Sequence, residues 1–308
     1  MRDRYYSKVI LFGEYSMIFD STALMVPLKK FSAQWRFASS AQGSTASNAS
    51  LKRFADYLST LDDAKEIFDL QRLNRDLRYN LYLDSNVPSG YGLGSSGTLV
   101  AAVYDGYAKQ KYDDYLKLKM FFGQMENYFH GSSSGIDPLQ CYLGKPFKIT
   151  PKNVEILNDG FLRNDIHICL IDTKIKSNTK PLVEHFKAQR ENPEFLKRFQ
   201  TEYLPYVKKC INAMIWNDKK VFFSSLRLLT KGQLQFLRPM ITDNTLDLFT
   251  SNYDFNFGVK ISGSGGGGYV LGFTDDVEKA KALLEGIDSN RTSSAGNDMP
   301  SKFEVIWL

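Results

Sequence analysis

The stretch Pro88-Ser-Gly-Tyr-Gly-Leu-Gly-Ser-Ser-Gly97 is the most informative part of this chain. It holds four glycines and three serines, and it leads directly into apolar residues at helical spacing: Leu99, Val100, Val103, Tyr104 and Tyr107. A glycine-rich turn that opens a helix leaves several backbone N–H groups unpaired at one point, and the helix dipole adds partial positive charge there. The stretch therefore favours the binding of a phosphate group.

The residues before this stretch alternate as in a β-strand, with Tyr79, Leu81 and Leu83 on one side. The predicted order is thus strand, glycine loop and helix. An ordinary connecting turn also contains glycines, so the loop by itself leaves both interpretations open.

Three other segments contain groups that phosphate chemistry requires. Near the N-terminus, Lys8-Val-Ile-Leu-Phe-Gly-Glu14 places an apolar strand between a cation and a carboxylate. The segment Glu126-Asn-Tyr-Phe-His-Gly-Ser-Ser-Ser-Gly-Ile-Asp137 has two carboxylates eleven residues apart, the first of them near the end of an amphipathic helix. Near the C-terminus, Lys260-Ile-Ser-Gly-Ser-Gly-Gly-Gly-Gly268 precedes a strand-like segment, and its four successive glycines suggest a close backbone approach.

Taken in this order, these segments resemble the motifs of the GHMP kinases, a family of small-molecule kinases named for galactose, homoserine, mevalonate and phosphomevalonate. The resemblance runs from Lys8 to about Phe273. Within the family the details are most similar to those of the mevalonate kinases. The segment Asp172-Thr-Lys-Ile-Lys-Ser-Asn-Thr-Lys180 resembles the Thr- and Lys-rich segment that opens the second half of those enzymes.

The chain also departs from the family pattern. Ser133 and Pro138 replace the usual Pro and Asn around the Gly-Ile-Asp sequence, and Ser264 stands where Ala is common. Tyr15 replaces the His that a mevalonate kinase would have, and in this it is closer to the phosphomevalonate kinases. His130 is expected to support the loop that follows it.

The resemblance implies an α+β, two-domain GHMP kinase-like fold with the active site in the cleft between the domains. Residues 1–160 would form the nucleotide- and phosphate-binding N-terminal domain, and residues 161–308 a C-terminal α+β domain. The chain lacks the Gly-x4-Gly-Lys-Ser/Thr loop of the P-loop NTPases. The residues that would instead hold the phosphates of ATP are Pro88, Gly90, Gly92, Leu93, Gly94, Ser95, Ser96 and Gly97.

Phosphoryl transfer depends on positioning and on neutralising charge. By resemblance, Asp137 would accept the proton of the acceptor hydroxyl. Lys8 would lie beside Asp137, lower its pKa and offset charge on the transferred group. Ser96 and Glu126 would hold Mg²⁺ through oxygen atoms. The substrate-binding residues would be Glu14, Thr179, Gly265 and Gly266.

Each of these roles has a structural alternative. Lys8 could be a surface cation at the end of a strand, and Glu126 a solvated helix residue. Asp137 and Ser96 could each cap a helix. Glu14 could stabilise the fold rather than orient a substrate.

The composition is that of an ordinary globular protein, with 308 residues of which 43% are hydrophobic and 24% charged. The net charge of +5, spread along the chain, suits anionic small molecules better than nucleic acid. Cys141, Cys169 and Cys210 are too widely spaced to suggest a disulfide framework, so a cytoplasmic location is expected. No apolar run approaches the roughly 20 residues of a membrane span, and no signal peptide is expected.

Local patterns predict the remaining elements. Asn192-Pro193 is typical of a helix start, and Pro205 should kink or interrupt the helix that follows. Gly286 is expected to end a helix, and the polar residues 288–297 to form a surface loop. Residues 39–50, rich in Ser, Ala, Gly and Asn, are expected to form a loop or hairpin tip. Strands are predicted at 8–12, 24–28, 146–149, 166–171 and 303–308, and helices at 51–61, 96–109 and 115–129.

The expected activity is ATP-dependent phosphorylation of a small hydroxylated carboxylate, with mevalonate as the first candidate. The alternatives are a relative that acts on phosphomevalonate or a sugar, and a family member that binds nucleotide or sugar without catalysis. Lys8, Ser96, Glu126 and Asp137 argue against a pure binder, because binding alone needs no base. A monomer or homodimer is expected, with no nucleic-acid or membrane partner.

Overall fold

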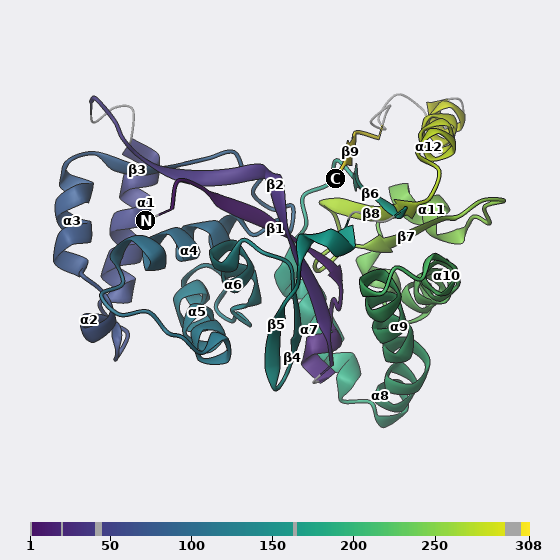
Figure 1. Cartoon of the computed structure of the whole chain (residues 1–308), viewed down its shortest axis with the longest axis horizontal. Coiled ribbons are helices and arrows are strands. Elements are labelled where there is room, and N and C mark those ends of the chain that lie inside the picture. Colours follow the sequence, from purple (N-terminus) through teal and green to yellow (C-terminus); the bar gives the residue numbers. More distant parts are fainter. Residues whose placement is uncertain (1, 20, 41–44, 163–164, 293–302) are drawn as a thin grey trace.

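The computed structural model describes residues 2–19, 21–40, 45–162, 165–292 and 303–308, and contains two antiparallel sheets (Figure 1). Helices α1 to α6 lie beside the first sheet and α8 to α12 beside the second, with α7 near the junction (Figure 1). The first sheet consists of β1 (Tyr5–Phe12), β2 (Ala23–Phe37), β3 (Leu81–Ser85), β4 (Phe147–Thr150) and β5 (Asn153–Ile156). The second has the order β7-β8-β6-β9 and consists of β6 (His167–Asp172), β7 (Phe257–Ile261), β8 (Tyr269–Thr274) and β9 (Val305–Trp307).

The helices fill the intervals between these strands. Those of the first half are α1 (Thr45–Leu58), α2 (Ala64–Ile67), α3 (Leu70–Arg78), α4 (Ser95–Tyr107), α5 (Tyr115–His130) and α6 (Ile136–Leu143). Those of the second half are α7 (Thr179–Arg190), α8 (Pro193–Arg198), α9 (Leu204–Ile215), α10 (Lys219–Phe236), α11 (Leu246–Thr250) and α12 (Val277–Thr292). Short 3-10 turns occupy Ser16–Phe19, Asp159–Leu162, Arg238–Met240 and Asp243–Thr245.

The long strand β2 organises the first sheet. It pairs with β1 along much of its length, with β3 through residues 33–37 and with β4 through residues 23–25. Pro27 pairs with Lys8 of β1, and neither β3 nor β4 extends to it. Because β2 has only one neighbouring strand at Pro27 in the described structure, the missing N–H of this residue is tolerated there.

Strand β1 contributes to two hydrophobic cores. Val9 and Leu11 belong to the core that contains β6, β7 and β8, whereas Ile10 packs against the core of α1, α3, α4 and α5. Because successive side chains of a strand point to opposite faces, Lys8 lies on the same face as Ile10 and points toward the helices of the first half. The end of β1, at Phe12, lies in the core that contains β6, β7 and β8.

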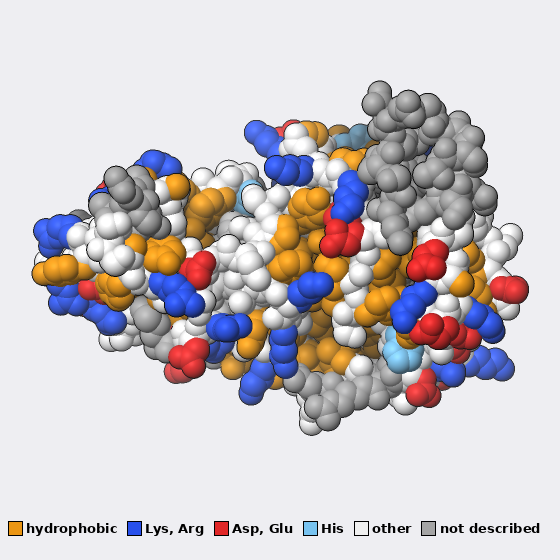
Figure 2. Space-filling view, turned by 90° about the horizontal axis from the view of Figure 1, so that it is seen from above, with side chains coloured by type: hydrophobic (Ala, Val, Ile, Leu, Met, Phe, Trp, Pro, Cys, Tyr) orange, Lys and Arg blue, Asp and Glu red, His pale blue; other side chains and the backbone are white. Residues whose placement is uncertain are grey.

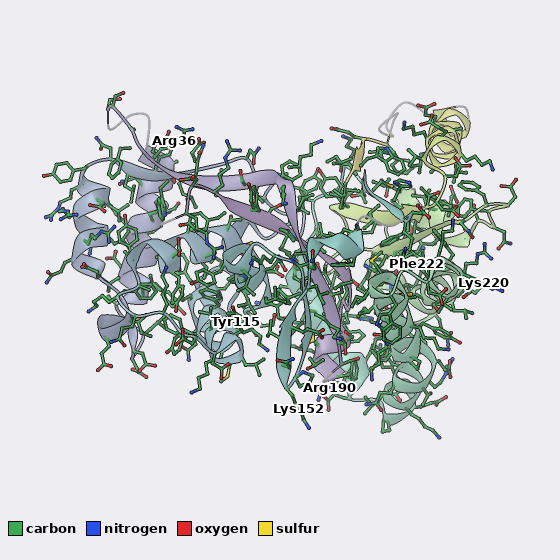
Figure 3. The ribbon with its side chains drawn as sticks, in the orientation of Figure 1. Arg36, Tyr115, Lys152, Arg190, Lys220 and Phe222 are labelled. Carbon is green, nitrogen blue, oxygen red and sulfur yellow. The ribbon has the colours of Figure 1, made fainter. Side chains whose placement is uncertain are left out.

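At that end, Phe12 stacks on Phe273 of β8, with ring centroids 5.4 Å apart. The ring of Phe222 of α10, labelled in Figure 3, meets Phe12 edge-on at 5.9 Å. Aromatic pairs in such geometries stabilise a core beyond the area they bury. They anchor the first strand of the chain among elements that lie more than two hundred residues later.

The surface agrees with the scattered charge of the sequence. Figure 2 shows Lys and Arg side chains spread over both halves of the upper face rather than gathered in one block, with hydrophobic side chains near its middle. On this face the described residues form no basic stripe of the kind typical of nucleic-acid binding.

The predicted helix start at Asn192 is confirmed. Its side chain accepts hydrogen bonds from the N–H groups of Glu194 and Phe195, and Pro193 is the first residue of α8. The interruption expected at Pro205 is also found: a π-helical segment, Phe199–Tyr203, separates α8 from α9, and Pro205 lies in the first turn of α9.

Other boundary predictions are wrong. Residues 45–50 are helical rather than a loop, and 41–44 lie outside the described residues. Asn48 of this helix donates to the carbonyl oxygens of Leu77 and Leu81, and Leu51 is buried, so tertiary contacts stabilise a segment of low intrinsic helix propensity. Helix α12 continues through Gly286 to residue 292, and 293–297 are not among the described residues.

Two glycines that flank the loop between α5 and α6 allow a test of backbone packing. Gly131 and Gly135 both have φ of +71°, but a Cβ at Gly135 would lie 1.9 Å from the carbonyl oxygen of Lys119, whereas nothing lies within 4 Å of one at Gly131. We expect Gly135→Ala to lower the free energy of unfolding by about 3 kcal/mol. Gly131→Ala should cost about 1 kcal/mol, from the left-handed backbone alone. Urea unfolding measures both, and equal losses would contradict this packing.

Candidate active site

The glycine-rich loop leads into the N-terminus of α4 as predicted. Gly94 is the N-cap residue with φ of +77°, and Gly92 has φ of +69°. A Cβ on Gly94 would lie 2.9 Å from Cγ of Lys8, and one on Gly97 would lie 3.0 Å from the backbone of Asp137. These glycines therefore let α4 approach both β1 and α6 closely.

Lys8 and Asp137, far apart in the chain, meet at this point. Lys8 Nζ lies 2.7 Å from Oδ2 of Asp137. The lysine side chain is 2% exposed and the aspartate 32%, so one side of the carboxylate remains accessible. Asp137 is in the first turn of α6, whose N-cap is Gly135, so this carboxylate also lies at the positive end of a helix dipole.

Glu126, near the end of α5, is buried beside this pair. Its Oε1 accepts a hydrogen bond of 2.7 Å from Ser96 Oγ, and its Oε2 one of 2.5 Å from Ser133 Oγ. Burial, followed by the charge of Asp137, raises the pKa of Glu126 to about 7. The imidazole of His130 lies 3.0 Å from Ser96 Oγ, and burial lowers its pKa. A cation bound next to Glu126 would therefore stabilise the charged form of its carboxylate.

Glu14 follows β1 and is not exposed on the surface. Its Oε1 accepts a hydrogen bond of 2.5 Å from Lys260 Nζ, and both side chains are almost completely buried. Lys260 Nζ also donates to the carbonyl oxygen of Ile261. Burial raises the pKa of Glu14 and lowers that of Lys260, while the partner's charge opposes both shifts. The first and last motifs are thus joined by a buried ion pair across 246 positions of sequence.

Tyr15, the residue that departs from the mevalonate kinase pattern, makes a second link between these motifs. Its hydroxyl donates to the carbonyl oxygen of Ser264 at 2.8 Å, and its ring lies 4.4 Å from that of Phe186 in α7. The backbone of Tyr15 has φ of +62°, which is strained for a residue with a side chain. Burial, followed by the charge of Glu14, raises the pKa of the hydroxyl.

The late glycine run packs largely against the protein's own backbone. A Cβ on Gly265 would lie 2.4 Å from the carbonyl oxygen of Met240, and one on Gly267 2.5 Å from that of Ile175. A Cβ on Gly266 would meet the side chain of Leu182. The close backbone approach expected for this run is therefore present, but its partners are internal.

A pocket of about 440 Å³ connects these groups. Its lining includes Lys8, Glu14 and Asp137, which the sequence predicts as catalytic or substrate-binding residues. Thr179 also lines the pocket, and its hydroxyl lies 3.0 Å from that of Ser264. From the glycine run, Gly263 and Ser264 line the pocket. A substrate role for Gly265 and Gly266 stays a prediction. The charged residues of the lining are Lys8, Glu14, Asp137 and Lys187.

The sequence around these groups matches a known family. Residues 52–145, which include the glycine loop, Glu126 and Asp137, match the GHMP kinases N terminal domain. This part of the chain is therefore similar to the N-terminal domain of the GHMP kinases. Members of this family are small-molecule phosphotransferases, and the resemblance seen in the motifs is confirmed.

Two curated relatives of the chain are mevalonate kinases. The mevalonate kinase of Dictyostelium discoideum is 23% identical over 225 residues, which cover 63% of this chain and 57% of that enzyme. The match thus spans little more than half the length of the Dictyostelium protein. The mevalonate kinase of Methanocaldococcus jannaschii is 23% identical over 303 residues, covering 91% of this chain and 93% of that enzyme.

A solved structure supports the GHMP kinase fold. The L. major mevalonate kinase, determined in complex with R-mevalonate, has a TM-score of 0.65 to this chain at 16% identity. The superposition covers 100% of this chain and 94% of that one. The predicted α+β fold of the GHMP kinases is therefore confirmed. The division at residue 160 stays a prediction.

The motifs of the sequence do not indicate some of the residues that complete this site. Ser133 was visible only as a departure from the family pattern, yet it is a direct partner of Glu126. Lys260 is the first residue of the late glycine motif, but the motif assigns it no role. Its partner Glu14 lies near the other end of the chain. Lys187 belongs to no motif.

None of the described helices combines the length and the apolar composition that a membrane span requires.

The buried pair of Glu14 and Lys260 should be strongly coupled. We expect Lys260→Met to lower the free energy of unfolding by about 3–5 kcal/mol, because it leaves a buried carboxylate without its cation. The double variant Glu14→Gln/Lys260→Met should be more stable than Lys260→Met alone by at least about 1 kcal/mol. Urea unfolding of the single and double variants measures this coupling.

The exposed pair of Arg198 and Glu202 provides a control. Arg198→Met should change stability by less than about 1 kcal/mol, since surface ion pairs contribute little. Additive losses for Glu14 and Lys260 would contradict the coupling.

Proposed function

We propose that this chain is an ATP-dependent kinase that transfers the γ-phosphoryl group to a hydroxyl of a small acceptor, with mevalonate as the first candidate. The observation that carries the proposal is the 2.7 Å pair of Lys8 and Asp137 beside the N-terminus of α4. It brings a base and a cation to a place where unpaired backbone N–H groups favour a phosphate.

The N-terminus of α4 is the proposed phosphate site. The left-handed conformations of Gly92 and Gly94 direct the chain into the helix, and Gly92 has no atom within 4 Å of its would-be Cβ. The backbone of the loop is thus free of side-chain bulk on that side. Phosphate oxygens of ATP would accept hydrogen bonds from the N–H groups of the first turn of α4.

Asp137 is the proposed base. As the acceptor oxygen forms its bond to the γ-phosphorus, the bond from that phosphorus to the β,γ-bridging oxygen breaks and ADP leaves. The proton of the acceptor hydroxyl passes to the accessible side of the Asp137 carboxylate. Lys8 Nζ holds the other carboxylate oxygen and balances negative charge next to the transferred group.

Glu126 and Ser96 are suited to hold Mg²⁺ together with ATP. Within the ranges that the structure describes, no group of three or more His, Cys, Asp or Glu could hold a metal alone. Mg²⁺ commonly binds through one or two carboxylates plus substrate phosphates, so a single buried glutamate with a serine hydroxyl fits it. The ion would neutralise phosphate charge, and Ser133 and Ser96 orient the carboxylate that holds it.

The pocket favours a partly apolar acceptor over a sugar. Alongside the charged groups, its lining contains the apolar side chains of Ile10, Met17, Ile18, Ala23, Met25, Ile136 and Val183. A sugar carries a hydroxyl on nearly every carbon, and several of these would face apolar walls without a hydrogen-bond partner. A short branched hydroxy acid buries hydrocarbon there instead.

A panel of acceptors with ATP and Mg²⁺ tests the activity. We expect the purified chain to release ADP with mevalonate and not with galactose. Phosphomevalonate is included because Tyr15 makes the first motif similar to that of the phosphomevalonate kinases. Coupled detection of ADP measures each rate. Turnover of a sugar alone would overturn the proposed acceptor, and nucleotide binding with no turnover of any acceptor would indicate a non-catalytic family member.

The role of Asp137 has its own test. We expect Asp137→Asn to bind ATP with near-normal affinity and to reduce kcat by a factor on the order of 10² or more, because the amide cannot accept the proton. Calorimetric ATP titration and steady-state rates measure the two quantities. The exposed Asp84, which pairs with Arg36 at the surface, provides a matched control in Asp84→Asn. An unchanged kcat for Asp137→Asn would remove it from this role.

A further inference from the structure

One of the charged residues that line the pocket has no partner of opposite charge in the described part of the chain. Lys8 pairs with Asp137, and Glu14 pairs with Lys260 behind the pocket wall. Lys187 also lines the pocket, and among the described residues it has no hydrogen-bond or ion-pair partner. One positive charge therefore remains without a counter-charge from the protein.

Helix α7 presents Lys187 to the pocket. Thr179, Val183 and Lys187 all line it, and their spacing of four residues puts them on one stripe of the helix. The rotation of the helix is set by Phe186, which is buried against Tyr15 at 4.4 Å and Phe19 at 5.6 Å.

The last turn of α7 is held by a further contact. The guanidinium of Arg190, labelled in Figure 3, lies 5.8 Å from the ring centroid of Phe19. Phe19 belongs to the 3-10 turn that follows the first motif. The backbone of Lys187 is thus held on a packed helix, while its own side chain is exposed and accessible to a ligand.

The pocket lining combines polar groups from different elements with apolar side chains. Asp137 and Lys8 form the reactive group, Lys187 comes from α7, and the apolar walls include Met17 and Val183. An acceptor that satisfies all three carries a hydroxyl for Asp137, a hydrocarbon middle, and one negative charge for Lys187. A single lysine balances a single charge, and a carboxylate supplies it.

We infer that Lys187 binds the carboxylate of the acceptor and thereby restricts this kinase to short hydroxy acids. The inference rests on the proposed function and specifies its substrate class. Lys187 acts in binding and lies on a different element from Lys8 and Asp137, so its removal affects acceptor affinity more than the chemical step.

The test compares an acid with its uncharged analogue. The acceptors are mevalonate and 3-methylpentane-1,3,5-triol, in which a hydroxymethyl group replaces the carboxylate. For Lys187→Met we expect KM for mevalonate to rise at least about tenfold, the scale of one lost charge-assisted hydrogen bond, with kcat within about threefold. KM for the triol should be the same in the variant and the wild type. Lys187→Arg should retain most of the affinity for mevalonate.

Lys180 provides the matched control. It lies on the same helix, is 77% exposed, does not line the pocket and faces Glu184 at 4.0 Å, so Lys180→Met should leave both KM values unchanged. An unchanged KM for mevalonate in Lys187→Met, or an equal rise for acid and triol, overturns the inference while the kinase activity stands. Absence of turnover by the wild type with either acceptor overturns the proposed function itself, and this inference with it.

Discussion

The site depends on a strand that is buried on both faces. Because β1 lies between two cores, the alternation of its side chains sends Val9 and Leu11 to one half of the molecule and Lys8 and Ile10 to the other. A one-residue slip of β1 against β2 would exchange these faces and place a lysine in the core around β8. The register in which Lys8 pairs with Pro27 is therefore what brings the cation to Asp137.

Close packing of α4 and α6 supplies the second half of this geometry. Gly97 brings the two helices near enough for backbone contact at Asp137, and Gly94 leaves room for the stem of Lys8. Two helix N-termini and a lysine then create positive potential at one point. The carboxylate of Asp137 balances part of this positive potential. A further cation would stabilise the charged form of the buried Glu126 beside it.

The local part of this architecture could be predicted from the sequence, and the long-range part could not. The glycine loop, the Asn192 cap and the Pro205 interruption follow from short-range backbone chemistry, and the structure has all three. The pairing of Glu14 with Lys260 spans 246 positions, and nothing in the spacing of either residue indicates the other. Residues 45–50, the first part of helix α1, were predicted as a loop for a related reason, because their helical state is stabilised by distant partners rather than by their own propensity. The glycine run shows an intermediate case: its need for close approach was evident, but what it approaches was not.

The buried link between the first and last motifs also limits how the two halves can move. Pulling Glu14 away from Lys260 would bring water to two desolvated charges, and the adjacent hydroxyl of Tyr15 would lose its acceptor on Ser264. The pair thus ties the first motif to the last one and keeps in place the part of the pocket lining that Glu14, Tyr15 and Ser264 form.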